Sequence, residues 1–533
     1  MTARRRTPAS MDASLDVDAA LCGMNAEELR GLIRDLLLEF DDRVHGRIRD
    51  LVIERAARSD SGWAPDRPTP DSISSVLDFA KAVKRVGYAD PSEVDEYLRQ
   101  GINAFLGRDY VSALEVFSAL LLPLGEGDID LGQHEMIDEV LSVDVAACAA
   151  MYVVATYMPA QPTQRAETVW AAIDEVRGVG HFWEPLREME RVAVEPLAQF
   201  DDFLRQWRAL IEENRGERES EWDSDEDRWL REVVVRIEGA GGLADLARAT
   251  RRAGDLRAWC RMLVTAKDWK AALAAHEEAA DIVTGKAYSR GEFLDGVALA
   301  ARKLGRRDLP TRLERAWREA PSMLRLRRWL GSAKSSVVVR KRATQALEVC
   351  PRKCVRQSGL LYVVLGDLSR AAKLLSRAPG LGWSDAEHPG HLLFPLFRRL
   401  LGGADTEASR ELDLISLRDM DADELEWVTD DREEPRLDAP GVYEIVQLAG
   451  TGETSGDEAR TVVPRAMRKA AEKRVAGVIE NKRRRHYDHA AKLVATCAAL
   501  DSSPETVSWV AGVRDEYRRY PAFQRELASH LRL

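Results

Sequence analysis

Apolar residues recur every three or four positions along almost the whole of this 533-residue chain, which is the spacing of one face of an α-helix. Residues 25–40, for example, place Leu29, Leu32, Ile33 and Leu36 on one stripe. No segment of strand length alternates apolar and polar residues between two turn signals, as a half-buried strand would. The sequence therefore predicts an all-α fold.

Length and composition restrict the class of protein further. A chain of 533 residues is too long for one ordinary core, so we expect several domains or an extended repeat array. Six scattered cysteines do not make a disulfide scaffold and favour a reducing compartment. The basic N-terminus lacks the apolar core of a signal peptide, and the longest apolar stretch, about 14 residues before Pro159, is short for a bilayer span. We therefore expect a cytoplasmic protein with no membrane contact.

One short pattern occurs four times: a polar residue, then an aromatic residue or Leu, then Ala three positions further on. The copies lie at 109–117, 268–279, 367–378 and 486–497. They resemble the turn and second helix of a tetratricopeptide repeat (TPR), in which the aromatic residue fills the hairpin and the Ala lets two helices approach closely. The resemblance implies packing roles for Tyr110, Ala113, Phe117, Trp269, Ala272, Leu368, Ala371, Tyr487 and Ala490, and hairpin turns at Gly107, Gly254 and Gly366.

The copies are spaced irregularly. They start 159, 99 and 119 residues apart, so the period of about 34 residues that defines a regular TPR array is absent. We therefore expect an irregular TPR-like array of helix hairpins, an α-solenoid that is extended or curved.

Turn residues and charge runs divide the chain into eight expected parts. The expected organisation is a disordered tail (1–24), a helical hairpin (25–57), a linker (58–72), a first helical-repeat region (73–215), an acidic joint exposed to solvent (216–228), a second helical-repeat region (229–403), an acidic linker with one short helix at 421–428 (404–463) and a basic helical region (464–533).

The net charge of −11 conceals three strongly charged blocks. Residues 302–356 hold 17 Arg or Lys against 4 acids, residues 404–459 hold 18 acids against 4 Arg, and residues 460–492 hold 11 Arg or Lys against 3 acids. Such blocks can steer charged partners. Alternatively, the acidic block folds over a basic groove of the same chain.

The best candidates for contact with an anionic partner lie in the two basic blocks. Lys482, Arg483, Arg484 and Arg485 are consecutive and could contact phosphates, with Tyr487 as a stacking partner for a base. The alternative is a solvated turn, or a surface that pairs with the acidic block. In the first block the candidates are Arg325, Arg327 and Arg328.

Motifs that carry chemistry are incomplete. His388 and His391 with Asp385 and Glu387 could surround a metal, but we favour a turn capped by Ser384 and Glu387. The stretch from His134 to Asp138 reads HExxD and not the HExxH of zinc proteases, and the pair Cys350 and Cys354 lacks further ligands. We therefore predict no catalytic residue, no cofactor and no metal site, and a protein that is not an enzyme.

Residues 360–397 and 471–531 resemble a helical-repeat region of bacterial proteins, some of which carry an N-terminal SWIM zinc finger. The Cys-x-Cys and Cys-x-His pairs of that finger are absent here, so no metal-binding residue is implied. The resemblance implies a helical-repeat fold and supplies no activity.

Three functions are compatible with these features. The first is a non-catalytic scaffold or adaptor, regulatory or defence-related, that binds a protein partner on a concave surface of helix hairpins. The second is a nucleic-acid-binding regulator that uses the Arg-rich stretches 302–356 and 481–493. The third, an enzyme on a helical scaffold, has no motif in its favour.

Overall fold

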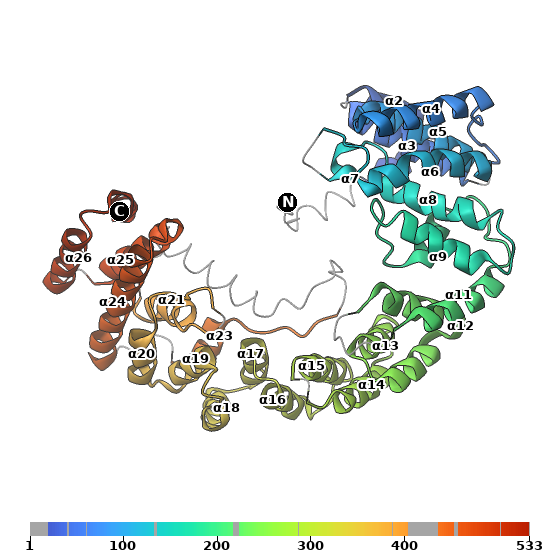
Figure 1. Ribbon diagram of the computed structural model, residues 1–533. Helices are drawn as coiled ribbons and strands as arrows, with labels where there is room; N and C mark the ends of the chain where they lie inside the picture. Colours follow the sequence, from blue (N-terminus) through green and yellow to red (C-terminus); the bar gives the residue numbers. More distant parts are fainter. Residues whose placement is uncertain are drawn as a thin grey trace. The chain divides into compact units, whose positions relative to one another are not determined.

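A computed structural model shows a chain built of α-helices (Figure 1). It describes residues 17, 20–39, 42–59, 61–132, 136–216, 223–285, 287–385, 387–402, 435–451, 457–501 and 503–531. Over these ranges no strand occurs, and the only β-type pairing is a single bridge between Tyr88 and Asp130. The prediction of an all-α protein is confirmed. Among the helices described, none has both the length and the apolar character needed to cross a bilayer.

The chain forms two compact units, residues 1–246 and 247–533. Unit 1 contains α2 (Ala26–Glu39), α3 (Asp42–Ala57), α4 (Pro70–Val86), α5 (Pro91–Leu106), α6 (Tyr110–Glu126), α7 (Ile137–Val140), α8 (Val145–Tyr157), α9 (Arg165–Glu175), α10 (Pro185–Val192) and α11 (Phe200–Asn214). Helix α12 (Asp225–Thr250) runs across the boundary and is interrupted at Gly239, which has a φ of 63°.

Unit 2 continues with helices of similar length. They are α13 (Ala253–Thr265), α14 (Trp269–Ile282), α15 (Ala287–Lys303), α16 (Leu309–Glu319), α17 (Met323–Gly331), α18 (Ser336–Val349), α19 (Val355–Leu365), α20 (Leu368–Arg377), α21 (Gly390–Leu400), α23 (Val442–Leu448), α24 (Asp457–Glu480), α25 (Tyr487–Leu500), α26 (Pro504–Glu516) and α27 (Pro521–His530), with a short 3₁₀ turn, η1 (Arg484–His486), before α25.

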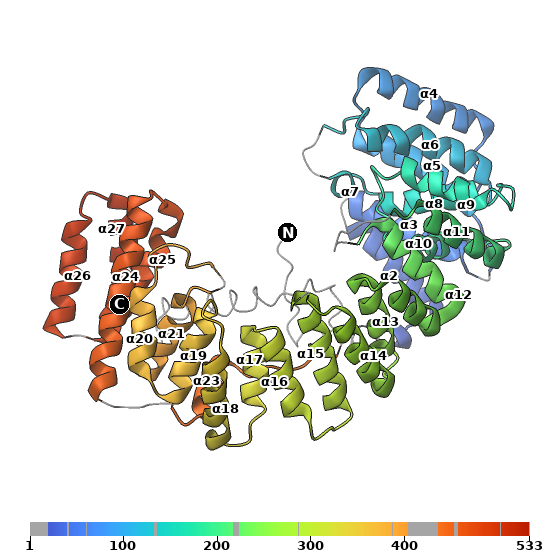
Figure 2. The ribbon, with the colours of Figure 1, turned by 60° about the horizontal axis from the view of Figure 1, so that its bottom comes forward.

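In unit 1 the core is organised around α8. This helix is apolar on nearly every side, as the sequence predicts for a core helix, and almost all of its residues are buried. Helices α5, α6, α9 and α10 all pack against it, and α4 covers α6 (Figure 2). A buried carboxylate fixes the chain before α8: Asp95 accepts hydrogen bonds from the main-chain N–H groups of Ser142 and Val143, at 2.9 Å and 3.0 Å.

In unit 2 neighbouring helices in the sequence are neighbours in space. From α13 to α20 each helix packs against the next, and α24, α25 and α27 extend the series from α20. Figure 1 shows this part nearly end-on, with α14, α16 and α18 in one row and α15, α17 and α19 in another. An apolar cluster extends from Ala298 on α15 to Leu527 on α27, so the helices from α15 onwards share one core.

The turns between paired helices share one backbone geometry. Arg108, Lys267 and Gly366 each adopt a left-handed conformation, and each precedes an Asp whose side chain caps the next helix. The N–H of that Asp donates to a carbonyl five residues back, as in Asp268 N to Leu263 O at 3.0 Å. The prediction of a turn at Gly254 is wrong, because Gly254 is buried inside α13. Lys267 is the left-handed residue of the turn before α14.

The small residues of the recurring pattern are core residues. Ala113, Ala272, Ala371 and Ala490 are fully buried, as is Phe117. The aromatic or Leu position is less buried in three of the four copies, since Tyr110, Trp269 and Leu368 keep partial exposure and Tyr487 is buried.

Two expectations for the acidic stretches have different outcomes. The short helix expected at 421–428 lies outside the described residues. The joint at 216–228 is not uniformly exposed, because Asp227 is buried and accepts a hydrogen bond from Arg215 Nε at 2.7 Å.

Candidate functional site

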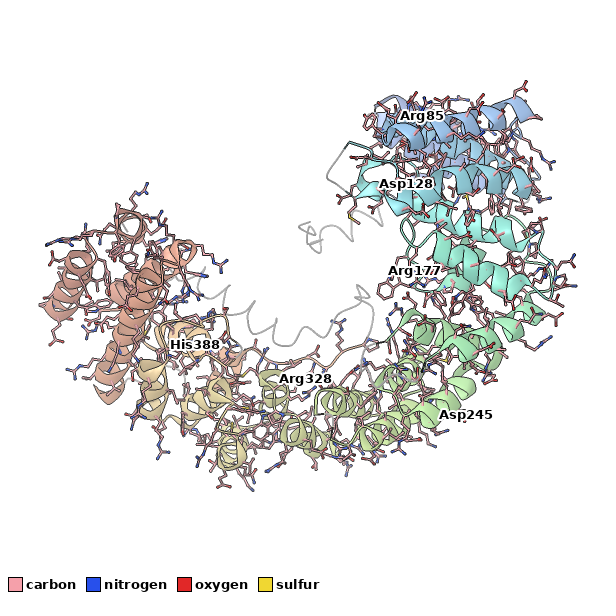
Figure 3. The ribbon with its side chains drawn as sticks, in the orientation of Figure 1. Arg85, Asp128, Arg177, Asp245, Arg328 and His388 are labelled. Atoms are coloured by element: carbon pink, nitrogen blue, oxygen red, sulfur yellow. The ribbon has the colours of Figure 1, made fainter. Side chains whose placement is uncertain are left out.

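The arginines of the first basic block are largely engaged within unit 2. Arg325 and Arg328 on α17 both form ion pairs with the buried carboxylate of Asp295 on α15, at 2.8 Å and 3.2 Å. Their side chains are only 15% and 11% exposed. Two of the three candidate contacts in this block therefore form a buried ion-pair network, with Arg328 labelled in Figure 3.

Residues 437–449, which we call the clasped segment, lie along this basic block. Arg327 Nε donates to the carbonyl of Pro440 at 2.9 Å, and Arg328 donates to that of Leu437 at 3.2 Å. Arg302 forms an ion pair with Asp438 at 2.7 Å, and Arg340 Nε donates to the carbonyl of Ala449 at 2.9 Å. All three candidate arginines of the block thus have partners in the same chain.

The clasped segment is packed as part of the core. Its helix α23 contacts α17, α18 and α19, and Ile445 and Val446 are fully buried there. Gly331 at the end of α17 lies so close to Pro440 that a methyl group on it would come within 2.1 Å of the proline Cγ. The carboxyl-terminal end of the acidic block thus covers part of the basic block, mostly through main-chain carbonyls and not through carboxylates.

The turn between α24 and α25 presents basic side chains of a different kind. Lys482, Arg483, Arg484 and Arg485 are all exposed, and we call them the basic turn. Within the described part of the chain none of the four forms an ion pair, and the one side-chain hydrogen bond is from Arg485 Nε to His486 Nε2 at 3.2 Å. Partial burial lowers the pKa of His486, and the positive charges of Arg474, Arg485 and Arg483 lower it further.

Tyr487 does not belong to this surface. It is buried, and its ring meets that of Phe523 edge-on with 5.9 Å between the centroids. The expectation that Tyr487 stacks on a base is therefore wrong for this conformation, whereas its expected role in packing fits the structure.

The histidines near α21 are used as structural groups. His388, labelled in Figure 3, has both ring nitrogens occupied: Nε2 lies 3.0 Å from the Pro379 carbonyl, and Nδ1 accepts from the Gly390 N–H at 3.1 Å. Glu387 accepts from the main-chain N–H of Arg356, in the first turn of α19, at 3.2 Å. The turn expected to be capped by Ser384 and Glu387 stays a prediction. These contacts leave His388 no nitrogen for a metal.

A second group of metal-ligating residues was missed at the sequence level. Asp488, Glu526 and His530 bring their ligand atoms within 4.8 Å of one another. Asp488 is already held by Lys492 Nζ at 2.6 Å and by His530 Nε2 at 2.7 Å, and the ammonium group opposes a cation at this position. The arrangement is an ion-pair cluster that ties α27 to α25, and the separation of 42 residues between Asp488 and His530 hides it from motif searches.

The thiols of Cys350 and Cys354 lack the activation of a catalytic cysteine. Burial raises the pKa of Cys350, and it raises the pKa of Cys354 to about 11. A reactive cysteine needs the opposite shift, towards the thiolate. His134 and Glu135 of the incomplete zinc-protease motif lie outside the described residues.

Comparisons with protein-family models, with curated proteins and with solved structures give no match for this chain. The resemblance to SWIM-associated helical repeats therefore stays a prediction, and the site itself has to carry any functional argument. Within the described residues the basic turn is an exposed cluster of consecutive cations that forms no ion pair.

Proposed function

We propose that the protein is a non-catalytic, cytoplasmic helical-repeat scaffold that binds an acidic surface of a protein partner. On this proposal its fold is an irregular TPR-like α-solenoid. The successive packing of α13 to α20 supports the proposal, because repeat arrays bury their cores between neighbouring hairpins in this way.

The basic turn is the observation that carries the binding proposal. Most arginines of the first basic block form ion pairs or donate to carbonyls, as Arg325 and Arg327 do. In the basic turn, by contrast, Arg483 and Arg484 are exposed, and no ion pair to them occurs within the described part of the chain. Clustered cations of this kind attract an acidic partner and accelerate association at low salt.

A binding experiment with the full-length protein tests this role. The triple variant Arg483→Ala, Arg484→Ala, Arg485→Ala removes three charges and leaves the left-handed turn residue Lys482, with its φ of 54°, unchanged. We expect the tagged variant to lose at least about 90% of the partner recovered by the wild type, and the wild-type complex to weaken as salt increases.

A matched control removes the same charge elsewhere. Arg30, Arg177 and Arg205 are exposed and each pairs with an acid three residues away, so replacing them with Ala changes the net charge equally. This control should keep the partner. Equal loss in both triple variants, or equal recovery in both, would contradict a role for the basic turn.

Nucleic acid is the second candidate partner, and it would bind through residues 481–493. The exposed cations of the basic turn favour it, but single-stranded nucleic acid sites combine cations with exposed aromatic rings, and Tyr487 is buried. If nuclease treatment abolishes recovery of the partner, the nucleic-acid alternative is selected. If recovery survives nuclease, the result supports a protein partner.

A further inference from the structure

Arg474 on α24 is a buried cation without a carboxylate. Arg474 is only 5% exposed, and within the described part of the chain its side chain forms no ion pair. Its guanidinium donates to the carbonyl of Gly380 at 3.2 Å, while its Nε is buried without a partner. Burial and the charge of Arg483 lower the pKa of Arg474 to about 10. An uncompensated buried charge is costly, so a nearby anion would be strongly stabilised.

Two further polar groups next to Arg474 lack hydrogen-bond partners. Trp383 is 3% exposed and its Nε1 donor has none, and the Nδ1 of His489 has none either. The guanidinium of Arg474 lies 6.0 Å from the centre of the Trp383 ring, and that ring meets His489 with 5.1 Å between the centroids. Three side chains with unsatisfied polar atoms, from three segments of unit 2, thus lie around the Trp383 ring. Buried polar atoms normally have partners, so this concentration marks a candidate ligand site.

The permanent charge in this group is the positive charge of Arg474. Burial lowers the pKa of His489 well below its usual value, and the charges of Arg474, His391, His486 and Lys492 lower it further. Two acids of the connection between α20 and α21 have other partners: the charge of Asp385 acts on His388, and Glu387 accepts from the main-chain N–H of Arg356. Neither forms an ion pair with Arg474. The surroundings favour an anion over a cation or a neutral ligand.

We propose that Arg474, Trp383 and His489 form a binding site for a phosphoryl group, supplied by inorganic phosphate or by a phosphate monoester. A guanidinium and an indole N–H are donors only, and phosphate offers several acceptor oxygens that can be reached from different directions. The site lies on α24, α25 and the connection between α20 and α21, so its ligand would tie these three segments together. It is separate from the proposed protein-binding role of the basic turn.

Calorimetric titration of the full-length protein with sodium phosphate, at constant ionic strength, tests the site. We expect wild type to bind phosphate and Trp383→Phe, which keeps the ring and removes the donor, to bind roughly tenfold more weakly. Arg474→Gln should weaken binding roughly a hundredfold or more. A second readout is the melting temperature of wild type, which should rise with phosphate and not with sodium chloride.

The control is Trp207→Phe in unit 1. Trp207 Nε1 is also buried without a partner, but its neighbours are the aromatic rings of Trp170, Trp229 and Phe203. This variant should bind phosphate like wild type. The absence of phosphate binding by wild type, equal binding by Arg474→Gln, or acetate binding as tight as phosphate would each overturn the proposal. Titration with ribose 5-phosphate then distinguishes the sources, because a site for monoesters accepts it and a site for free phosphate does not.

Discussion

The imidazole of His276 on α14 lies directly against Gly296 on α15. A methyl group at Gly296 would come within 2.2 Å of the ring. The two helices can therefore approach this closely only because residue 296 has no side chain. Both nitrogens of His276 are buried without a hydrogen-bond partner, although the position is the large apolar one in other copies of the recurring pattern. The contact therefore combines close packing with an unfavourable polar burial.

Replacing Gly296 with Ala should destabilise unit 2. The new methyl group overlaps the His276 ring, which is enclosed between α14 and α15, and overpacking of this kind costs about 1–3 kcal/mol. The midpoint of urea unfolding measures the effect. Gly512→Ala on α26 is the control, because no atom lies within 4 Å of the added methyl, and it should be neutral or stabilising. An unchanged midpoint for Gly296→Ala would show that the helices can separate without cost.

His276 should make the stability of the protein fall in acid. Burial lowers the pKa of His276 to about 4, below its ordinary value of 6.5. The unfolded chain therefore binds a proton first, so this stabilisation is complete above pH 6.5 and is lost as the pH falls towards 4. Between pH 7.5 and 5.0 the loss is about 2 kcal/mol. His276→Leu should abolish that part of the pH dependence, and an identical acid loss in wild type and variant would contradict the prediction.

Glu232 should have the opposite pH dependence. It accepts from the main-chain N–H groups of Leu186 and Arg187 at the start of α10, at 3.1 Å and 2.7 Å, but burial raises its pKa to about 7. The folded state then holds the proton more tightly than the unfolded state, so stability falls as the pH rises from about 4.5 to 7. The loss is about 3 kcal/mol at most.

The variant Glu232→Gln keeps an acceptor for the start of α10 and cannot ionise. Its stability should change less than that of wild type between pH 5 and pH 8, as measured by urea unfolding followed through tryptophan fluorescence. Parallel pH profiles for the two proteins would show that Glu232 does not titrate in this range.

The sequence predicted the helix caps and the buried alanines well, because both depend on residues that lie close together in the chain. The Asp residues of the recurring pattern are helix caps, and their Ala residues are buried, as in the pair Asp268 and Ala272. The pattern also placed His276 on the buried face of α14. It did not predict the close contact that encloses the His276 ring, because that contact is with Gly296, which lies 20 residues further along the chain.

The candidate site was less predictable. Arg327 and Arg340 find their partners in main-chain carbonyls, which have no signature in the sequence, and those carbonyls lie 109 to 113 residues away. The group of Trp383, Arg474 and His489 is assembled from segments separated by most of the acidic block. No spacing rule connects such residues, whereas the basic turn was evident because its four cations are consecutive.

The turn residue Lys267 offers a stabilising substitution. Its φ of 58° is unfavourable for a residue with a Cβ, by about 1–2 kcal/mol, whereas glycine adopts this conformation freely. Lys267→Gly should therefore stabilise the α13–α14 hairpin by about 0.5–1 kcal/mol after the entropy cost of glycine, as measured by the urea midpoint. Lys270→Gly, at an exposed position of α14, should destabilise by about 1 kcal/mol. A loss of stability in both variants would show that the Lys267 side chain has a stabilising contact.

The clasped segment also affects the order in which the protein can fold during synthesis. Helices α17, α18 and α19 are complete by residue 365, yet the apolar surface that Ile445 and Val446 cover remains open until residues 442–448 have been made. At about 5–20 residues per second, that interval of some 80 residues lasts several seconds. During this time the middle of unit 2 exposes an apolar face to solvent. We therefore expect a chaperone to bind the nascent chain at that stage.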